Sequence, residues 1–101
     1  MIIQCKINGI AYKLDVLMSK DEKQEGLKKY NYLPDHRGVI FVYYKDNISN
    51  YDFSKIGYKC RILFLNSNYE VIYHEKTKPY QDKLVSCNVP CRYVIEIGSP
   101  G

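Results

Sequence analysis

The N-terminal part of the chain alternates between apolar and polar residues in two short runs. The runs are Ile2–Ile7 and Ile10–Met18, and Asn8-Gly9 separates them. Asn-Gly between two apolar runs is typical of a tight β-hairpin, because both residues tolerate positive φ. The apolar residues of the second run share one face at a period of two, namely Ile10, Tyr12, Leu14 and Val16. The pattern therefore predicts an opening β-hairpin.

A helix start follows this hairpin. Ser19 and Glu22 have the spacing of a capping box, in which each side chain bonds the other residue's backbone N–H. Acidic residues open the segment and lysines close it, an order that the helix dipole favours. The pattern predicts one short helix over Lys20–Tyr30. Gly26 lies inside that range, and we expect it to allow a close contact with the sheet.

Two strongly apolar runs mark the centre of the chain. Val39–Tyr44 follows a turn cluster at Pro34–Gly38 and does not alternate, which is typical of a strand covered on both faces. The second run is Cys60–Leu65, which a polar turn at Asn66–Asn68 connects to Tyr69–His74. We therefore predict a covered central strand and then a second hairpin.

The last quarter of the chain contains a loop and two more predicted strands. Lys76–Asp82 is polar and contains Pro79, so we expect a loop there. A short strand over Leu84–Val89 and a closing strand over Cys91–Ile97 follow. Together the elements predict a mainly β (α+β) fold: a compact small barrel or sandwich of about seven strands, with one short helix after the first hairpin. The whole chain, 1–101, is expected to be one domain.

Composition supports a β-rich fold and excludes several classes of function. Ile and Val total 18 residues and Tyr and Phe total 14, whereas Ala, Leu and Met together reach 10. The net charge of +4 comes from scattered basic residues, so we do not expect nucleic-acid binding. No apolar run approaches the ~18–20 residues that cross a bilayer, and Met1–Lys6 lacks the features of a secretory signal. We expect a soluble protein of the cytoplasm.

The residues that most often carry chemistry form no recognisable catalytic or metal motif. The cysteines are Cys5, Cys60, Cys87 and Cys91, and the histidines are His36 and His74. Only two cysteines are close in sequence, with three residues between them, which is not the usual spacing of a zinc knuckle. We expect reduced thiols, no metal and no cofactor. A disulfide between those two cysteines and a Cys–His hydrolase remain open as alternatives.

Glu96 is the one acidic residue inside the predicted closing strand. It lies between Ile95 and Ile97, so its side chain is on the opposite face of the strand from theirs. We expect it to point outward or to pair with a base such as Arg61 or Arg92.

An ordered set of short segments resembles the family called domain of unknown function 192. The segments are Glu25-Gly26-Leu27, Leu33-Pro34, Gly38–Val42, Arg61–Leu65 and Arg92–Ile97, followed by Gly101. The resemblance covers nearly the whole chain. It implies a compact, mainly β domain with one short helix and no established catalytic activity. Copies similar to this family also occur in phage genomes.

The sequence departs from the family in its most polar segment. Family members usually carry an aromatic-Trp-Met-Lys-Asn-Thr segment, followed by Pro-Leu-Asp at the start of the central strand. Here Asp52 is at the Trp position, Ser54 and Lys55 align with the Lys-Asn pair, and Arg61 replaces the Asp. Any family pocket is therefore lost or rebuilt. In an alternative hypothesis for function, Ser54, Lys55 and Arg61 line a rebuilt pocket in a module that binds an anionic small molecule.

Tyrosine is the most unusual feature of the composition, with 11 residues and no Trp. Tyr30, Tyr32, Tyr43 and Tyr44 are the candidate interface residues, because tyrosine suits protein contacts and adjacent strand residues face opposite sides. The first hypothesis is thus a non-catalytic structural or interaction protein. It would be an accessory subunit of a larger assembly, such as a capsid or tail protein of a virion if phage-encoded, with other protein subunits as partners.

Overall fold

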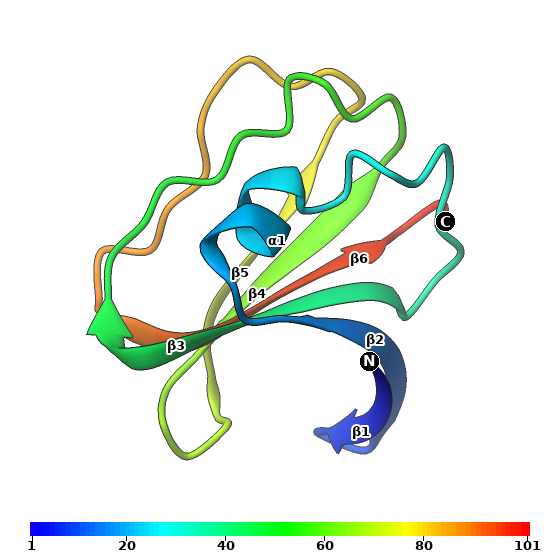
Figure 1. The fold of residues 1–101 in the computed structure, drawn as a ribbon. Coiled ribbons are helices and arrows are strands. Elements are labelled where there is room, and N and C mark those ends of the chain that lie inside the picture. The colour runs from blue at the N-terminus through cyan, green and yellow to red at the C-terminus, as the bar shows by residue number, and fades with distance from the viewer.

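The computed structural model describes residues 1–101 as one sheet of six strands with a single short helix (Figure 1). The strands are β1 (Ile2–Ile7), β2 (Ile10–Leu17), β3 (Arg37–Asn47), β4 (Cys60–Leu65), β5 (Val71–Thr77) and β6 (Cys91–Gly98), and helix α1 covers Lys20–Glu25. Their order in the sheet is β1-β2-β3-β6-β4-β5. Only β2 and β3 pair in parallel. The mainly β fold with one short helix that the sequence predicts is confirmed.

Both predicted hairpins are present. In the first turn Asn8 has a φ of 52° and Gly9 a φ of 81°, the positive values that a tight two-residue hairpin turn requires. In the second turn the Asn66 side-chain oxygen accepts hydrogen bonds from the backbone N–H groups of Asn68 and Glu70, each at 3.0 Å. The turn therefore includes Tyr69 and Glu70, and β5 begins at Val71 rather than at the expected Tyr69.

Helix α1 is shorter than predicted. The capping box is present, with the Glu22 N–H donating to Ser19 Oγ at 3.1 Å and the Ser19 N–H donating to Glu22 Oε1 at 2.9 Å. The prediction of a helix as far as Tyr30 is wrong, because Gly26 adopts a φ of +52° and ends the helix. The expected close approach is real: a methyl group on Gly26 would lie 3.6 Å from Phe41 Cζ.

The predicted strand over Leu84–Val89 does not form. Only Val85 pairs, in an isolated bridge whose two backbone hydrogen bonds with Tyr51 are 2.8 and 3.0 Å long. Val85 and Cys87 still bury their side chains, so the segment packs on the core without extending the sheet. The sheet therefore has six strands rather than about seven, and β3 continues through an irregular stretch to Asn47.

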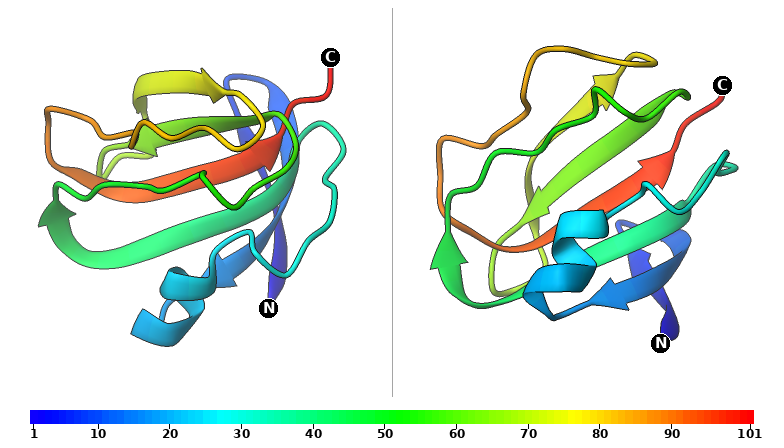
Figure 2. Two further views of the ribbon diagram at one scale, coloured as in Figure 1. Left: turned by 90° about the horizontal axis from the view of Figure 1, so that it is seen from above. Right: turned by 45° about the horizontal axis from the view of Figure 1, so that its top comes forward.

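Both faces of the sheet are covered. Sixteen buried residues form the core on the face that carries α1, and eight others form a second core on the opposite face. The loops 48–59 and 78–90 run on the same side as α1, whereas the β1–β2 hairpin curls over the other side (Figure 2). The central strands β3, β6 and β4 are consequently buried on both sides. No helix of this structure has the length and hydrophobicity needed to span a membrane.

Tight backbone packing at the end of β6 gives a direct test of this arrangement. A Cβ on Gly98 would lie 2.0 Å from the Leu33 carbonyl oxygen, whereas one on Gly101 would meet nothing within 4 Å. We expect Gly98→Ala to lower the free energy of unfolding by roughly 1–3 kcal/mol, because backbone atoms have to move. Gly101→Ala is the matched control and should leave it unchanged. Equal stability of both variants in urea titrations would contradict the packing described here.

Candidate ligand-binding cleft

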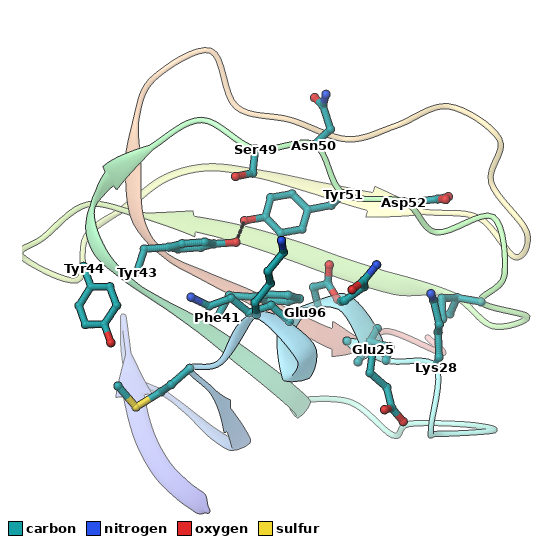
Figure 3. A pocket seen from close by; sticks show the side chains of 17 residues that line it. Glu25, Lys28, Phe41, Tyr43, Tyr44, Ser49, Asn50, Tyr51, Asp52 and Glu96 are labelled. Carbon is teal, nitrogen blue, oxygen red and sulfur yellow. Dashed lines mark hydrogen bonds between the residues drawn. The ribbon is translucent and has the colours of Figure 1, made fainter.

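A cleft of about 640 Å³ opens on the face of the sheet that carries α1 (Figure 3). Helix α1 and the residues after it form one wall, and the segment 49–52 forms the other. The floor comes from β3 and β6, which contribute Phe41, Tyr43 and Glu96. The cleft therefore joins segments that are far apart in the sequence.

Glu96 lies at the base of this cleft. On β6 it pairs with Val39 of β3 and Ile62 of β4, in the middle of the sheet. The residue is only 5% exposed, and its carboxyl takes part in none of the side-chain hydrogen bonds or ion pairs of the structure. Burial raises the pKa of the Glu96 carboxyl to about 8, so the neutral acid dominates near neutral pH.

The expectation that Glu96 points outward or pairs with an arginine is wrong. Its face of β6 is the one covered by α1, so the side opposite Ile95 and Ile97 is also core. Arg92 instead donates from Nε to Asp46 Oδ1 at 3.0 Å. Arg61 lies on the other face of the sheet, because its neighbours in β4, Cys60 and Ile62, belong to the core beneath α1.

Aromatic rings form much of the cleft interior. The Phe41 and Tyr51 rings meet edge to face, with centroids 5.3 Å apart and an interplanar angle of 76°. The hydroxyl groups of Tyr43 and Tyr51 are hydrogen-bonded at 2.7 Å. Burial raises the pKa of both phenols, so both stay uncharged at neutral pH. The interior of the cleft is thus an uncharged, aromatic space that contains two paired hydroxyl groups and one carboxyl.

Three lysines of α1 and the turn after it line one wall of the cleft. Lys23 Nζ lies 4.1 Å from the centroid of the Tyr43 ring, within the range of a cation–π contact. Partial burial lowers the pKa of Lys23. Lys20 and Lys28 also line the cleft and are exposed. Figure 3 shows that the carboxyl ends of the other two lining acids, Glu25 and Asp52, are turned away from Glu96.

The three residues of the predicted rebuilt pocket do not meet. None of the three, Ser54, Lys55 or Arg61, lines the cleft. The Ser54 N–H donates to Asp52 Oδ1 at 2.8 Å within the loop before β4, whereas Arg61 is on the opposite face of the sheet. The alignment with the family showed which residue types had changed. It could not show that the Arg61 side chain lies on the face of the sheet opposite the cleft.

The four predicted interface tyrosines differ in their burial. Tyr44 is 95% exposed and Tyr32 is 57% exposed, whereas Tyr30 and Tyr43 are half-buried and pack against the core. Tyr43 and Tyr44 differ as neighbouring strand residues should, because one joins the cleft floor and the other reaches solvent. Contact between these residues and a partner stays a prediction.

The thiols and imidazoles lie outside the cleft. All four cysteines are free, and burial raises the pKa of Cys60 and of Cys91 to about 12. His36 packs edge to face against Tyr12, and His74 is exposed on β5. No three His, Cys, Asp or Glu side chains are grouped so that they could hold a metal ion.

Sequence reasoning missed most of this cleft. Lys23, Phe41 and Tyr51 come from a helix, a strand and a loop, and no local motif connects them. Glu96 did give a signal, because it is a single acid in an otherwise apolar part of a strand. Whether this acid faces solvent or a cleft depends on which face of β6 α1 covers, and the sequence does not show that.

Comparison with known proteins supports the fold. No curated protein matches the sequence significantly. A protein from Sinorhizobium meliloti 1021, described as a candidate transcription regulator, has a similar structure: the TM-score is 0.80 at 15% identity, over 97% of this chain and 78% of that one. A protein of unknown function from Novosphingobium aromaticivorans DSM 12444 has a TM-score of 0.81 at 17% identity, over 97% of this chain and 72% of that one. At such identities the likeness concerns the fold alone.

The sequence also matches a family model across nearly its whole length. The model is that of DUF192, a family described as "Uncharacterized ACR", and the match covers residues 3–99. The resemblance inferred from the ordered segments is thereby confirmed, and this chain belongs to the DUF192 family.

Proposed function

We propose that the protein is a non-catalytic module that binds a small organic molecule in the aromatic cleft. The observation that carries this proposal is the Glu96 carboxyl, which is buried and unpartnered at the base of a cleft of about 640 Å³. Ligand sites are typically concave and mostly apolar, with a few polar groups that fix the orientation of the ligand. The interior of this cleft has that composition, with the Phe41 and Tyr51 rings beside one carboxyl, whereas its mouth is polar.

The energetic argument concerns the cost of keeping a carboxyl at this position. The difference between an ordinary pKa of 4.5 and a folded-state pKa of about 8 corresponds to roughly 5 kcal/mol as an upper bound. Small domains have only about 5–15 kcal/mol of total stability. A glutamine or an apolar residue would avoid this cost. Strongly perturbed carboxyls in clefts are often functional, which supports a role for Glu96 in binding.

The mouth of the cleft favours an anionic group on the ligand. Lys20, Lys23 and Lys28 supply three positive charges, and Glu25 and Asp52 supply two negative charges, which leaves an excess of one positive charge (3 − 2 = 1). The proposal thus keeps, as one group of the ligand, the anionic charge expected from the sequence. The residues proposed to attract it are lysines of α1 and the turn after it, in place of Lys55 and Arg61.

A second candidate function is the accessory subunit of a larger assembly, such as a virion. Exposed tyrosines favour it, since Tyr44, Tyr80 and Tyr69 are 95%, 66% and 57% exposed. Strands β1 and β5 also have one unpaired edge each, which could pair with a strand of another subunit.

The pH dependence of stability tests the state of Glu96. The folded chain keeps a proton, up to about pH 8, that the unfolded chain loses near pH 4.5. The associated stability is therefore complete below pH 4.5 and is lost as the pH rises through about 8. In Glu96→Gln, which mimics the protonated acid, urea titrations should lack this decline. The exposed control Asp82→Asn should retain it. Parallel curves for wild type and Glu96→Gln would contradict burial of an unpartnered acid.

A thermal-shift screen of small metabolites tests the cleft as a binding site. Ligands that bind the folded state raise the melting temperature by mass action. Gln24 lines the cleft on α1, so Gln24→Trp should abolish the shifts by filling part of the space. The matched control Gln4→Trp places the same ring on exposed β1 and should preserve the shifts. No shift at millimolar ligand, or shifts that survive in Gln24→Trp, would refute ligand binding at this cleft.

Copurification from the native lysate tests the second candidate. An accessory subunit should elute from a size-exclusion column with a partner in a fixed ratio, as light scattering would measure. Tyr44→Ser should weaken that association at least about tenfold if this exposed ring is an interface anchor. Tyr80→Ser is the comparison variant, because it removes an exposed ring from loop 78–90 rather than from β3. A strictly monomeric protein recovered alone would exclude the role.

A further inference from the structure

We propose that the ligand of this cleft is a zwitterion, with an ammonium group beside Glu96 at the inner end and a carboxylate beside Lys20 and Lys28 at the outer end. This inference rests on the proposed function and deepens it by naming the chemical class of the ligand.

The inner end of the cleft has an acid that no cation of the chain reaches. Elsewhere, acids with a nearby base form pairs: Asp15 with Lys29 Nζ at 2.8 Å, and Asp46 with Arg92 Nε at 3.0 Å. Glu96 has no such partner, although three lysines line the same cleft. An ammonium group from a ligand would donate hydrogen bonds to the carboxyl and supply the charge that it lacks.

The aromatic walls also favour a cation at the inner end. The face of the Tyr43 ring is occupied by the Lys23 ammonium, 4.1 Å from its centroid, so the ring beside Glu96 that remains for a ligand cation is that of Phe41. Phe41 is next to Glu96, since a methyl group on Gly26 would lie 3.6 Å from Phe41 Cζ and 3.9 Å from Glu96 Oε1. Ring faces attract cations and repel anions, as does a carboxylate. The inner end therefore selects against an anionic group.

The outer end has the opposite preference. Lys20 and Lys28 are exposed at the mouth, and the carboxyl ends of Glu25 and Asp52 point away from the cleft centre (Figure 3). The Asp52 carboxylate is also engaged by the Ser54 N–H at 2.8 Å. A ligand with only a positive charge would make no favourable charge contact with these lysines. A ligand with charges of both signs matches both ends of the cleft.

Three probes with the same para-substituted ring separate these contributions: 4-(aminomethyl)benzoate, 4-methylbenzylamine and 4-methylbenzoate. Each is titrated into the ¹⁵N-labelled full chain, and shifts of the Gly26, Phe41 and Glu96 amides locate binding. We expect the zwitterion to bind at least about tenfold more tightly than 4-methylbenzoate, because it makes a charge-assisted hydrogen bond to Glu96. Its advantage over 4-methylbenzylamine should be about two- to threefold and should shrink in high salt.

Variants assign each end to its residues. Glu96→Gln should weaken both amines about tenfold and leave 4-methylbenzoate unchanged. The double variant Lys20→Gln, Lys28→Gln should weaken the two carboxylates by about two- to threefold and leave 4-methylbenzylamine unchanged. Lys6→Gln, on exposed β1, is the control and should alter none of the three affinities.

Proton release distinguishes a direct contact with Glu96 from a structural effect. An ammonium that ionises Glu96 should release close to one proton per ligand between about pH 5 and pH 7, and about half a proton at pH 8, as titration calorimetry in two buffers would measure. The groups whose charge acts on or beside Glu96 are Tyr43 on β3, Tyr51 and Tyr58 on loop 48–59, Cys60 on β4, and Lys23 and Glu25 on α1. Burial raises the pKa of the phenols and the thiol, so they stay protonated in this range.

The outcomes separate the inference from the function on which it rests. Tightest binding by 4-methylbenzoate at the cleft amides would overturn the zwitterion and retain the ligand-binding module. Equal affinity of the two amines for wild type and Glu96→Gln would also overturn the zwitterion, whatever the stability of the variant. Shifts confined to residues outside the cleft, or no shifts at millimolar concentrations of all three probes, would count against both.

Discussion

The burial of β6 on both faces is the constraint on which the rest of this structure depends. β6 lies between β3 and β4, with one core beneath α1 and another under the β1–β2 hairpin. A strand in this position has no face available for a solvated residue. Val94, Ile95 and Ile97 satisfy that condition, and Glu96 does not. The same packing that stabilises the sheet thus leaves the Glu96 carboxyl mostly buried at the base of the cleft, as the one carboxyl of the cleft interior.

The crossover from β2 to β3 determines how that carboxyl is covered. Parallel pairing of these strands requires a connection over one face of the sheet, and α1 is part of it. Because Gly26 ends the helix with positive φ, the chain turns directly above Phe41 and Glu96. The opposite wall comes from the loop after β3, held where Tyr51 pairs with Val85. The cleft is the space left between these two connections.

Membership of DUF192 and the similar solved structures establish the fold, but they assign no chemistry to it. A fold can host many unrelated functions, so an argument about function has to come from the site. Here the site combines an acid without a partner, uncharged aromatic walls and a lysine-rich mouth. Those three features are the basis on which we propose a small charged ligand, and the separation of the acid from the lysines is the basis for its proposed orientation.

The sequence by itself determined the local elements of this protein. Asn8-Gly9 determined the first hairpin, and Ser19 with Glu22 determined the start of the helix. The non-alternating run of β3 indicated a strand that is covered on both faces. Turn, capping and periodicity signals act over a few residues, so they can be recognised in the sequence. Tertiary structure alone decided that Glu96 is buried and that Arg61 faces away from it. Those outcomes depend on which segment covers which face of the sheet, and contacts between residues distant in the sequence leave no local signature.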